Sequence, residues 1–226
     1  MGNGIVKYLK KLIRCFLDII YYSEQECVVC GKKLFEELYL CSTCREKIVS
    51  CEESMKIKIC NKETRIYSAL YYSSAVKKIV LGLKYKNDFR CGDVLADYMM
   101  KTIKNEKIYF DMVTYVPLSK ENEKKRGYNQ SKYLAKCIGD KFNKKVIGCI
   151  RKSKDTKDQI GLNGKERWKN LKDSFSFIKG RNIKNKKILL VDDVITTGAT
   201  TYYCVLELLK NNSNEIIVLT AAKSKI

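Results

Sequence analysis

The chain of 226 residues contains no histidine. This absence excludes every catalytic system that needs an imidazole, such as a Ser-His-Asp triad or a Cys-His nucleophile pair. A metal site in this protein must therefore use cysteine sulfur, carboxylate oxygen or water.

The sequence also lacks an uninterrupted apolar run long enough to span a membrane. Residues 4–22 come nearest, but Lys7, Lys10, Lys11 and Arg14 interrupt them, and no small-residue cleavage site follows. Their apolar residues recur at helical spacing, which predicts a helix packed on the protein, with docking at a membrane surface as the minority alternative. We expect a cytoplasmic protein without a membrane span, either free or peripheral to the inner face of the membrane.

Acidic residues are few relative to basic ones, because 45 Lys and Arg face 25 Asp and Glu and give a net charge of +20. Such a charge suits anionic partners, including nucleic acid, phosphorylated metabolites and acidic proteins. The lysines are dispersed along the chain rather than gathered in one segment. A merely solvated basic surface is therefore an equal alternative.

Cysteine, by contrast, is abundant, with eleven residues in a chain without a cleavable signal pattern. This combination indicates a reducing compartment, where cysteine pairs bind metal more often than they form disulfides. Two Cys-x2-Cys pairs, Cys27 with Cys30 and Cys41 with Cys44, predict two tight turns around one tetrahedral Zn²⁺. Four sulfur ligands would close the site to water, so the zinc would be structural. The alternatives are buried free thiols or a redox pair.

Two later cysteines, Cys51 and Cys60, are available to replace a ligand of this site. The N-terminal helix and the zinc knuckle would together form a first unit over residues 1–62. The polar stretch 52–63 is interpreted as the linker to a second unit over residues 63–226.

From Arg65 onward, short apolar runs alternate with helical patterns, which favours an α/β domain with a parallel sheet. Strands are expected at 66–72, 112–116, 174–178, 187–191 and 215–222. Four helices are expected from helical spacing. One starts near Val76, one covers 94–103, one ends near Phe142, and one follows Thr201. The stretches 118–130 and 151–170 are predicted to be polar loops, the second of them a mobile lid.

The most informative stretch runs from Lys187 to Thr201. Its continuous apolar run is typical of a strand buried on both faces of a parallel sheet, and the run ends in Asp192 and Asp193. A hydroxyl-rich loop around Gly198 and then a helix follow. Because ligands of parallel sheets bind beyond the carboxyl ends of the strands, this loop is a candidate binding site.

The chemistry of the loop suits a phosphate. A helix N-terminus offers unpaired N–H groups, and Gly198 permits a close approach to the backbone. Asp192 and Asp193 suit vicinal sugar hydroxyls or a Mg²⁺-bound diol. The available hydroxyl donors are Thr196, Thr197, Thr200 and Thr201. An ordinary strand-turn-helix with aspartate in the turn is the plain alternative.

This stretch resembles the motif by which type I phosphoribosyltransferases bind 5-phosphoribosyl-1-pyrophosphate (PRPP): apolar residues, two acids, then Thr-Gly-x-Thr. The sequence has no Walker-type Gly-Lys-Ser/Thr loop and no Gly-x-Gly-x-x-Gly turn after a strand. The common alternatives for nucleotide binding therefore have no support.

Five segments in order make the chain similar to the ComF family of competence-associated proteins. They are the doubled Cys-x2-Cys, Leu83-Lys84-Tyr85, Val116-Pro117 leading to Arg126-Gly127-Tyr128-Asn129-Gln130, the stretch from Arg151 to Asn170, and the stretch from Val191 to Thr200. Pro117 is a single proline where family members often have two, which is a departure in the loop that follows. The resemblance implies a type I phosphoribosyltransferase-like parallel sheet flanked by helices, a small N-terminal zinc-binding domain, and a role in DNA uptake during bacterial transformation.

If the protein is an enzyme, it transfers phosphoribose from PRPP with loss of pyrophosphate. Asp192 and Asp193 would be its catalytic carboxylates and would hold the ribose hydroxyls and Mg²⁺, with Asp193 as the base because histidine is absent. Lys84 and Arg126 would hold the pyrophosphate. The residues that would cradle the 5-phosphate are Thr196, Thr197, Gly198, Ala199 and Thr200.

If the protein is instead a binding module, the same site recognises a nucleotide or single-stranded DNA without turnover, inside the DNA-uptake machinery. Basic residues would follow the phosphate backbone, and tyrosines such as Tyr71, Tyr72 and Tyr128 would stack on bases. The expected partners are then a DNA-uptake helicase or other competence proteins. Both hypotheses stand at this stage.

Overall fold

The protein is described by a computed structural model that covers residues 25–34, 39–153, 168 and 171–224. The expected N-terminal helix at 4–22 lies outside the described residues. So does most of the stretch 151–170, which was expected to form a lid. None of the described helices combines the length and the apolar character that crossing a bilayer requires.

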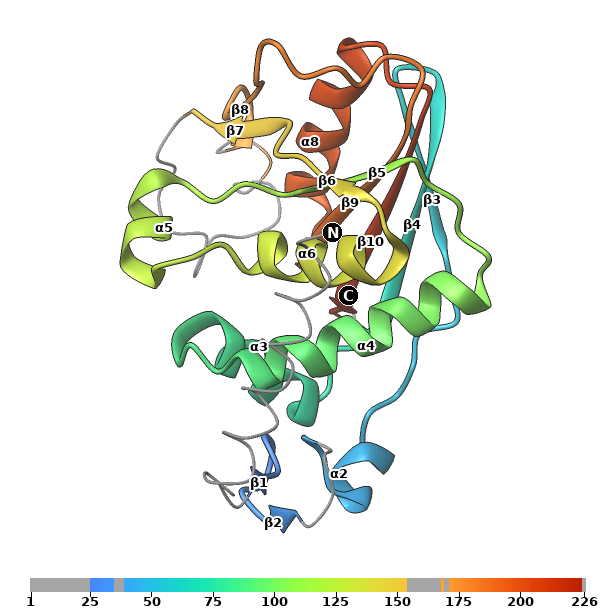
Figure 1. Ribbon diagram of the computed structural model, residues 1–226. Coiled ribbons are helices and arrows are strands. Elements are labelled where there is room, and N and C mark those ends of the chain that lie inside the picture. Colours follow the sequence, from blue (N-terminus) through green and yellow to red (C-terminus); the bar gives the residue numbers. More distant parts are fainter. Residues whose placement is uncertain (1–24, 35–38, 154–167, 169–170, 225–226) are drawn as a thin grey trace, which may run out of the picture.

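A six-stranded sheet in the order β3-β4-β10-β9-β5-β6 forms the centre of the molecule (Figure 1). All neighbours in it are parallel except β3 and β4. Its strands are β3 (Met55–Ile59), β4 (Lys62–Tyr71), β5 (Met112–Tyr115), β6 (Lys145–Val146), β9 (Lys187–Ile195) and β10 (Glu215–Lys223). Two small antiparallel pairs lie outside it: β1 (Gln25–Glu26) with β2 (Lys33–Leu34), and β7 (Ile150–Lys152) with β8 (Phe175–Phe177).

The described helices are α2 (Ser42–Glu46), α3 (Ser74–Tyr85), α4 (Phe89–Asn105), α5 (Lys120–Arg126), α6 (Gln130–Phe142) and α8 (Ala199–Lys210). Helices α3, α4 and α6 cover one face of the sheet, and α8 with the β7–β8 pair covers the other (Figure 1). The expected fold class, an α/β parallel sheet flanked by helices behind a small cysteine-containing N-terminal unit, is confirmed.

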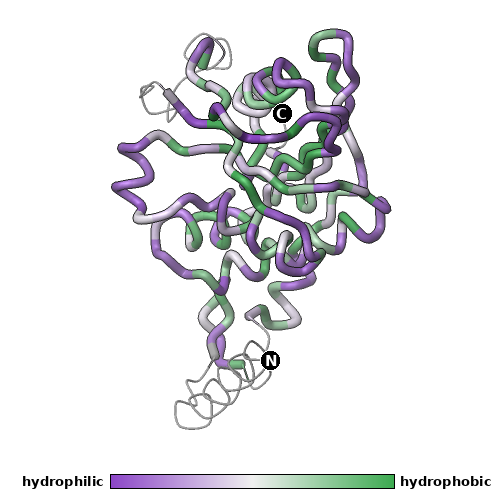
Figure 2. Tube along the Cα trace, turned by 45° about the horizontal axis from the view of Figure 1, so that its top comes forward, coloured by the Kyte–Doolittle hydropathy of each residue, from purple (hydrophilic) through white to green (hydrophobic). Residues whose placement is uncertain are grey.

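Strand β9 lies in the middle of the sheet and is buried on both faces, as its continuous apolar run predicts. Leu189 and Val191 point into the core under α3, α4 and α6, whereas Ile188 and Leu190 point into the core under α8. All four side chains are fully buried. Figure 2 shows hydrophobic stretches toward the interior of the molecule and hydrophilic stretches along the outer loops.

The sheet has a switch point between β5 and β9. The connection from β5 to β6 runs through α6 on one face, and the connection from β9 to β10 runs through α8 on the other. In open parallel sheets the loops that follow such strands diverge and leave room for a ligand at the carboxyl edge. Arg126 lies in the connection that follows β5, and the two aspartates lie near the carboxyl end of β9 itself.

Two expectations about local structure are wrong. Residues 52–63 are not a linker, because Met55–Ile59 forms the edge strand β3 against β4. Its apolar residues alternate with Lys56 and Lys58, which is the pattern of a half-buried edge strand. The predicted loop 118–130 contains the short helix α5. The strand expected at 174–178 is confirmed as Phe175–Phe177 and pairs with β7. The division of the chain into two units stays a prediction.

The N-terminal cysteine unit lies against α3 and α4, below them in Figure 1. Leu40 and Ile48 of this unit belong to the same buried cluster as Val76 and Leu95 of the two helices. Lys78 also donates a hydrogen bond from Nζ to the carbonyl of Val29 at 3.3 Å. The cysteine unit therefore shares one core with the larger part of the chain.

Candidate functional site

Two groups of polar side chains merit a functional account. The first, called the acid-pair site below, consists of Asp192, Asp193, Lys84 and Arg126 at the carboxyl edge of the sheet. The second, called the cysteine cluster, consists of Cys27, Cys30, Cys41 and Cys44.

The two aspartates lie inside strand β9, which continues through Ile195, and not just after it as the sequence indicated. Each aspartate is only 8% exposed. Because successive residues of a strand point to opposite faces, the two carboxylates project in different directions. They therefore have different partners.

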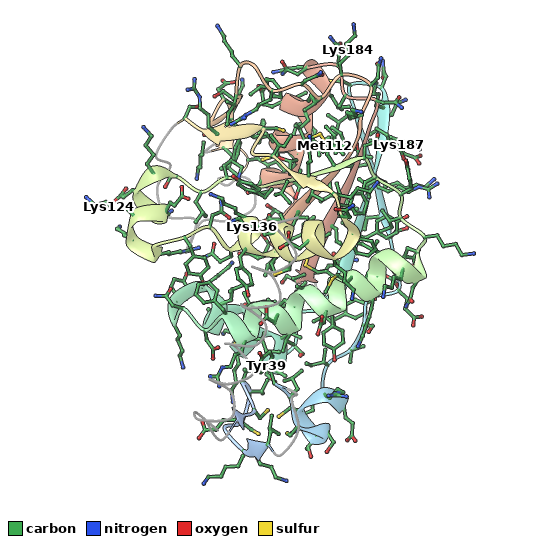
Figure 3. The ribbon with its side chains drawn as sticks, viewed as in Figure 1. Tyr39, Met112, Lys124, Lys136, Lys184 and Lys187 are labelled. Atoms are coloured by element: carbon green, nitrogen blue, oxygen red, sulfur yellow. The ribbon has the colours of Figure 1, made fainter. Side chains whose placement is uncertain are left out.

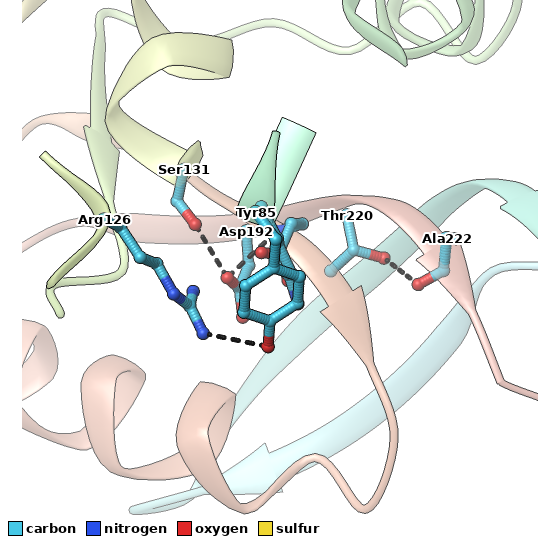
Figure 4. Close-up of polar contacts among 8 residues, drawn as sticks. Tyr85, Arg126, Ser131, Asp192, Thr220 and Ala222 are labelled. Atoms are coloured by element: carbon cyan, nitrogen blue, oxygen red, sulfur yellow. Dashed lines mark hydrogen bonds and ion pairs between the residues drawn. The ribbon is translucent and has the colours of Figure 1, made fainter. Parts of the chain in front are cut away.

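Asp192 is held by hydrogen bonds at Oδ1. Ser131 donates from Oγ at 2.9 Å, and the backbone N–H of Asp193 donates at 2.9 Å (Figure 4). Ser131 lies in the first turn of α6, which begins at Gln130. Burial, followed by the nearby charge of Asp193, raises the pKa of Asp192 to about 7, and the hydrogen bonds oppose that shift only in part.

Asp193 pairs with Lys84, whose Nζ lies 3.0 Å from Oδ1 of the aspartate. Lys84 is in the last turn of α3 and is brought to the sheet edge by that helix. Although burial acts in the other direction, the charge of Asp193 and the hydrogen bond to it raise the pKa of Lys84. The ion pair is therefore a fixed part of the site rather than a loose surface contact.

Arg126 lies at the end of α5 and turns toward the end of α3. Its Nη2 donates to the hydroxyl of Tyr85 at 3.3 Å, and its guanidinium carbon lies 5.0 Å from the centre of the Tyr85 ring. Gly127 follows with a φ of 77°, so it ends the helix in the left-handed region that glycine favours. The structure thus brings Arg126 next to the residue that follows Lys84 (Figure 4).

The hydroxyl-rich loop joins β9 to α8. Gly198 is the N-cap of that helix, with a φ of 75°, and Ala199 is the first helical residue. Thr196 and Thr197 are exposed, Thr200 is half-buried and Thr201 is buried. The loop therefore presents hydroxyl groups and helix N–H groups at the same edge of the sheet as the aspartates.

Sequence reasoning missed Ser131 and Gln130, two buried polar residues at the start of α6. The amide atoms Nε2 and Oε1 of Gln130 are buried, and neither has a hydrogen-bond partner among the described residues. Gln130 belongs to one of the segments that carry the ComF resemblance, but no role was predicted for it. Ser131 lies outside those segments. Sequence offered no signal for Ser131, because its partner Asp192 lies 61 residues away.

The cysteine cluster assembles as the spacing predicted. The sulfur atoms of Cys27, Cys30, Cys41 and Cys44 all lie within 4.8 Å of one another. The sulfurs of Cys30 and Cys41 are 3.7 Å apart. In a tetrahedron with Zn–S bonds of about 2.3 Å, sulfurs are separated by roughly 3.8 Å, so the four positions fit a zinc ion. Among the described residues, neither Cys51 nor Cys60 belongs to the group.

Local backbone explains why these sulfurs converge. Gly31 has a φ of 73°, and its N–H bonds to the carbonyl of Cys27 at 2.8 Å, which closes the first turn. Cys41 is the N-cap of α2, and Cys44 lies inside that helix. Although burial opposes it, hydrogen bonds from backbone groups, with that of Cys41 the largest, lower the pKa of Cys27 to about 6. Burial, followed by the neighbouring sulfurs, raises the pKa of Cys44 to about 12.

Curated relatives cover most of the chain. It is 25% identical over 205 residues to competence protein F of Haemophilus influenzae, a match that covers 88% of this chain and 81% of the relative. It is 27% identical over 179 residues to competence protein ComFC of Streptococcus pneumoniae, covering 78% and 71%. The DNA utilization protein YhgH of Salmonella typhimurium is 24% identical, covering 85% and 87%. The predicted ComF resemblance is confirmed. No model of a protein family matches the chain.

Among solved structures, similar ones include the glutamine PRPP amidotransferase of B. subtilis, with a TM-score of 0.39 and 16% identity. That match covers 58% of this chain and 26% of the amidotransferase chain. The purine phosphoribosyltransferase of Pyrococcus horikoshii has a TM-score of 0.35 and 19% identity, covering 58% of this chain and 71% of its own.

Proposed function

We propose that the acid-pair site binds the ribose phosphate of PRPP together with Mg²⁺, and that the protein acts in DNA uptake during natural transformation. The single observation that carries the binding proposal is that three separate segments bring their charged side chains to the same edge of the sheet. Lys84 comes from the segment after β4, Arg126 from the loop after β5, and the aspartates and threonine loop from β9. The names of the curated competence relatives support the cellular role.

Within this proposal each group has a chemical task. The N–H groups at the start of α8 and the hydroxyls of the loop hold the 5-phosphate. Asp193 would hold the ribose hydroxyls and a Mg²⁺, because carboxylate oxygens are ligands that Mg²⁺ prefers, and the ion would supply positive charge for the pyrophosphate. Arg126 contributes bidentate hydrogen bonds to the leaving pyrophosphate, where charge develops as the anomeric carbon becomes cationic.

The ion pair of Lys84 with Asp193 sets a condition on metal binding. An ammonium group 3.0 Å from the carboxylate occupies a position that a cation would need. Mg²⁺ should therefore bind poorly alone and well together with PRPP, whose phosphates can take over Lys84. Isothermal calorimetry of the full chain tests this, with Mg²⁺ alone, PRPP alone and both together. No binding of PRPP with Mg²⁺ would overturn the proposal.

A second candidate is a binding module that holds a nucleotide or single-stranded DNA without turnover. The observation that favours it is charge: the chain carries +20, and lysines such as Lys124 and Lys184 extend outward from separate parts of the molecule (Figure 3). Binding of a single-stranded oligonucleotide should then weaken steeply as salt rises, because neutralised phosphates release counterions. Affinity that does not respond to salt would remove this candidate.

For the cysteine cluster we propose one structural Zn²⁺ held by Cys27, Cys30, Cys41 and Cys44. Four thiolate ligands leave no open coordination position, so the ion would stabilise the fold of the N-terminal unit and would not activate water. Because β3 belongs to the main sheet, we place the boundary between this unit and the larger domain before Met55 rather than after residue 62.

A further inference from the structure

Two large aromatic side chains are exposed at the end of α3 and the start of α4. Tyr85 directly follows Lys84 and is 57% exposed, and Phe89 is 43% exposed. Figure 4 shows Arg126 bonded to the hydroxyl of Tyr85. Aromatic surface is therefore available to solvent at the border of the acid-pair site.

The ring of Phe89 packs against the rings of Tyr128 and Tyr133. Its centre lies 5.0 Å from the ring centre of Tyr128 and 5.0 Å from that of Tyr133. Tyr128 donates its hydroxyl hydrogen to the carbonyl of Leu83. Tyr133 donates to Asp93 at 2.6 Å. Because both supporting tyrosines are tied by their hydroxyls, the outer face of Phe89 is presented in a fixed position.

Tyr133 has little freedom to move for a second reason. A Cβ atom added at Gly92 of α4 would lie 2.5 Å from Cε1 of Tyr133, so the ring lies flat against a helix backbone that only glycine allows. The arrangement of Phe89, Tyr128 and Tyr133 is therefore part of how α4 packs on α6. A surface of this kind costs little conformational entropy when a ligand binds to it.

The charge next to these rings is positive. The guanidinium of Arg126 covers the Tyr85 ring at 5.0 Å, and Lys84 precedes that tyrosine in the chain. A ligand that suits both features is planar and carries negative charge close to its planar part. A nucleobase attached to a ribose phosphate has this combination, and stacking of bases on aromatic rings tolerates any base.

We propose that Tyr85 and Phe89 form a stacking surface for the nucleobase of the ligand whose ribose phosphate the acid-pair site holds. This inference rests on the proposed function and adds the part of the ligand that PRPP lacks. The base can belong to a mononucleotide or to single-stranded DNA. In this proposal Tyr128, which was expected to stack on a base, supports the ring of Phe89 instead.

The chain offers a matched control in Tyr109. This tyrosine is 61% exposed and is flanked by Lys144 and Lys187, whose Nζ atoms lie 5.3 and 5.7 Å from its ring centre. It precedes β5 and so lies at the opposite, amino edge of the sheet. An exposed tyrosine with basic neighbours is thus present at a place where no ribose-phosphate site exists.

The test compares Tyr85→Leu, Phe89→Leu and Tyr109→Leu in the full chain, titrated with AMP, with PRPP plus Mg²⁺, and with an oligothymidylate. We expect each of the first two substitutions to weaken AMP or oligothymidylate binding about tenfold. Phe89→Leu should leave PRPP affinity within about twofold of wild type. Tyr85→Leu also removes the ring and the hydroxyl that Arg126 contacts, so the comparison with PRPP uses Phe89→Leu. Tyr85→Trp should keep the affinity, because it retains an aromatic face. Tyr109→Leu should change none of the three.

The outcomes separate this inference from the proposed function. Loss of oligothymidylate binding without loss of AMP binding identifies the base as that of a polymer, and the reverse identifies a mononucleotide. Unchanged affinity for AMP and oligothymidylate in Tyr85→Leu and Phe89→Leu, or an equal loss of PRPP affinity in Phe89→Leu, overturns the stacking surface. Failure of wild-type protein to bind PRPP overturns the proposed function instead, and the base-containing probes still test the aromatic residues.

Discussion

The cysteine cluster and the acid-pair site solve the same problem of bringing charged side chains together, but in opposite ways. The four cysteines come from one short segment, between Cys27 and Cys44, and among the described residues they have mainly one another as partners. The acid-pair site draws on segments that are far apart in the chain, and its own Lys84 neutralises Asp193. If the zinc proposal holds, the first arrangement depends on a metal, whereas the ion pair of the second forms without a ligand.

Helix α3 joins the two regions, so the comparison has a structural consequence. Lys78 of α3 bonds to the first knuckle, and Lys84 at the end of the same helix pairs with Asp193. The core between the cysteine unit and α4 is shared as well. Loss of the metal should therefore lower the stability of the larger domain without unfolding that domain.

The largest effect is expected from removing the metal. Strong chelation, or Cys44→Ser, should unfold the N-terminal unit, because structural zinc sites contribute on the order of 10 kcal/mol to folding. The larger domain should stay folded with a lower Tm, since it loses contacts of Leu40 and Ile48. Metal analysis, limited proteolysis and circular dichroism measure this. About one Zn²⁺ per chain is expected, and a metal-free protein with a protease-resistant N-terminal unit would contradict the proposal.

The acid-pair site should respond in the opposite way, with loss of binding and no loss of fold. Replacing Asp192 and Asp193 by Asn keeps the side-chain volume but removes the charges for Mg²⁺ and ribose. We expect the affinity for PRPP with Mg²⁺ to fall about 10- to 100-fold, the range given by one to two charged hydrogen bonds. Calorimetry measures the affinity, and circular dichroism confirms the fold.

A control for this double variant is Asp111→Asn at the other edge of the sheet. Asp111 accepts a hydrogen bond from the backbone N–H of Lys187 at 2.8 Å, so its replacement should lower stability and leave PRPP affinity unchanged. If the double Asn variant binds PRPP as wild type does, the aspartates are only part of the strand end, and the transferase hypothesis rests on resemblance alone.

The two regions also differ in how far the sequence revealed them. The cysteine spacing was sufficient to predict the cluster, because four cysteines in one short segment can meet without any long-range contact in the fold. Strand β9 could be predicted for a similar reason, since its apolar run is buried on both faces. Helix α5 could not be predicted, because none of its residues is buried and so it has no apolar period. The bond from Ser131 to Asp192 depends on the order of the strands, which the local sequence does not contain.

The threonine loop allows a smaller and more selective test through Gly198. An added Cβ would meet only Cδ1 of Ile195, at 3.9 Å, so space is available and the φ of 75° is the whole obstacle. Gly198→Ala should cost about 1 kcal/mol, and Gly198→Asn less, because asparagine tolerates the left-handed region. Urea denaturation of both variants measures the difference. Equal losses for Ala and Asn would show that backbone strain is not the cause.

A pH dependence of stability is expected that belongs to Asp192 and not to the cysteine cluster. Burial, then the charge of Asp193, raises the pKa of Asp192 from 3.8 to about 7. Between these values the folded protein keeps a proton that the unfolded chain has lost, so this group makes the free energy of unfolding fall as the pH rises through that window. Asp192→Asn has no proton to lose, and its stability should therefore fall less than that of wild type between about pH 5 and about pH 7.5. Urea denaturation of both proteins at the two pH values isolates the difference, because every other titrating group is shared. The same pH slope in wild type and in Asp192→Asn would mean that the folded carboxyl is already ionised at pH 5, held so by Ser131 and the Asp193 N–H.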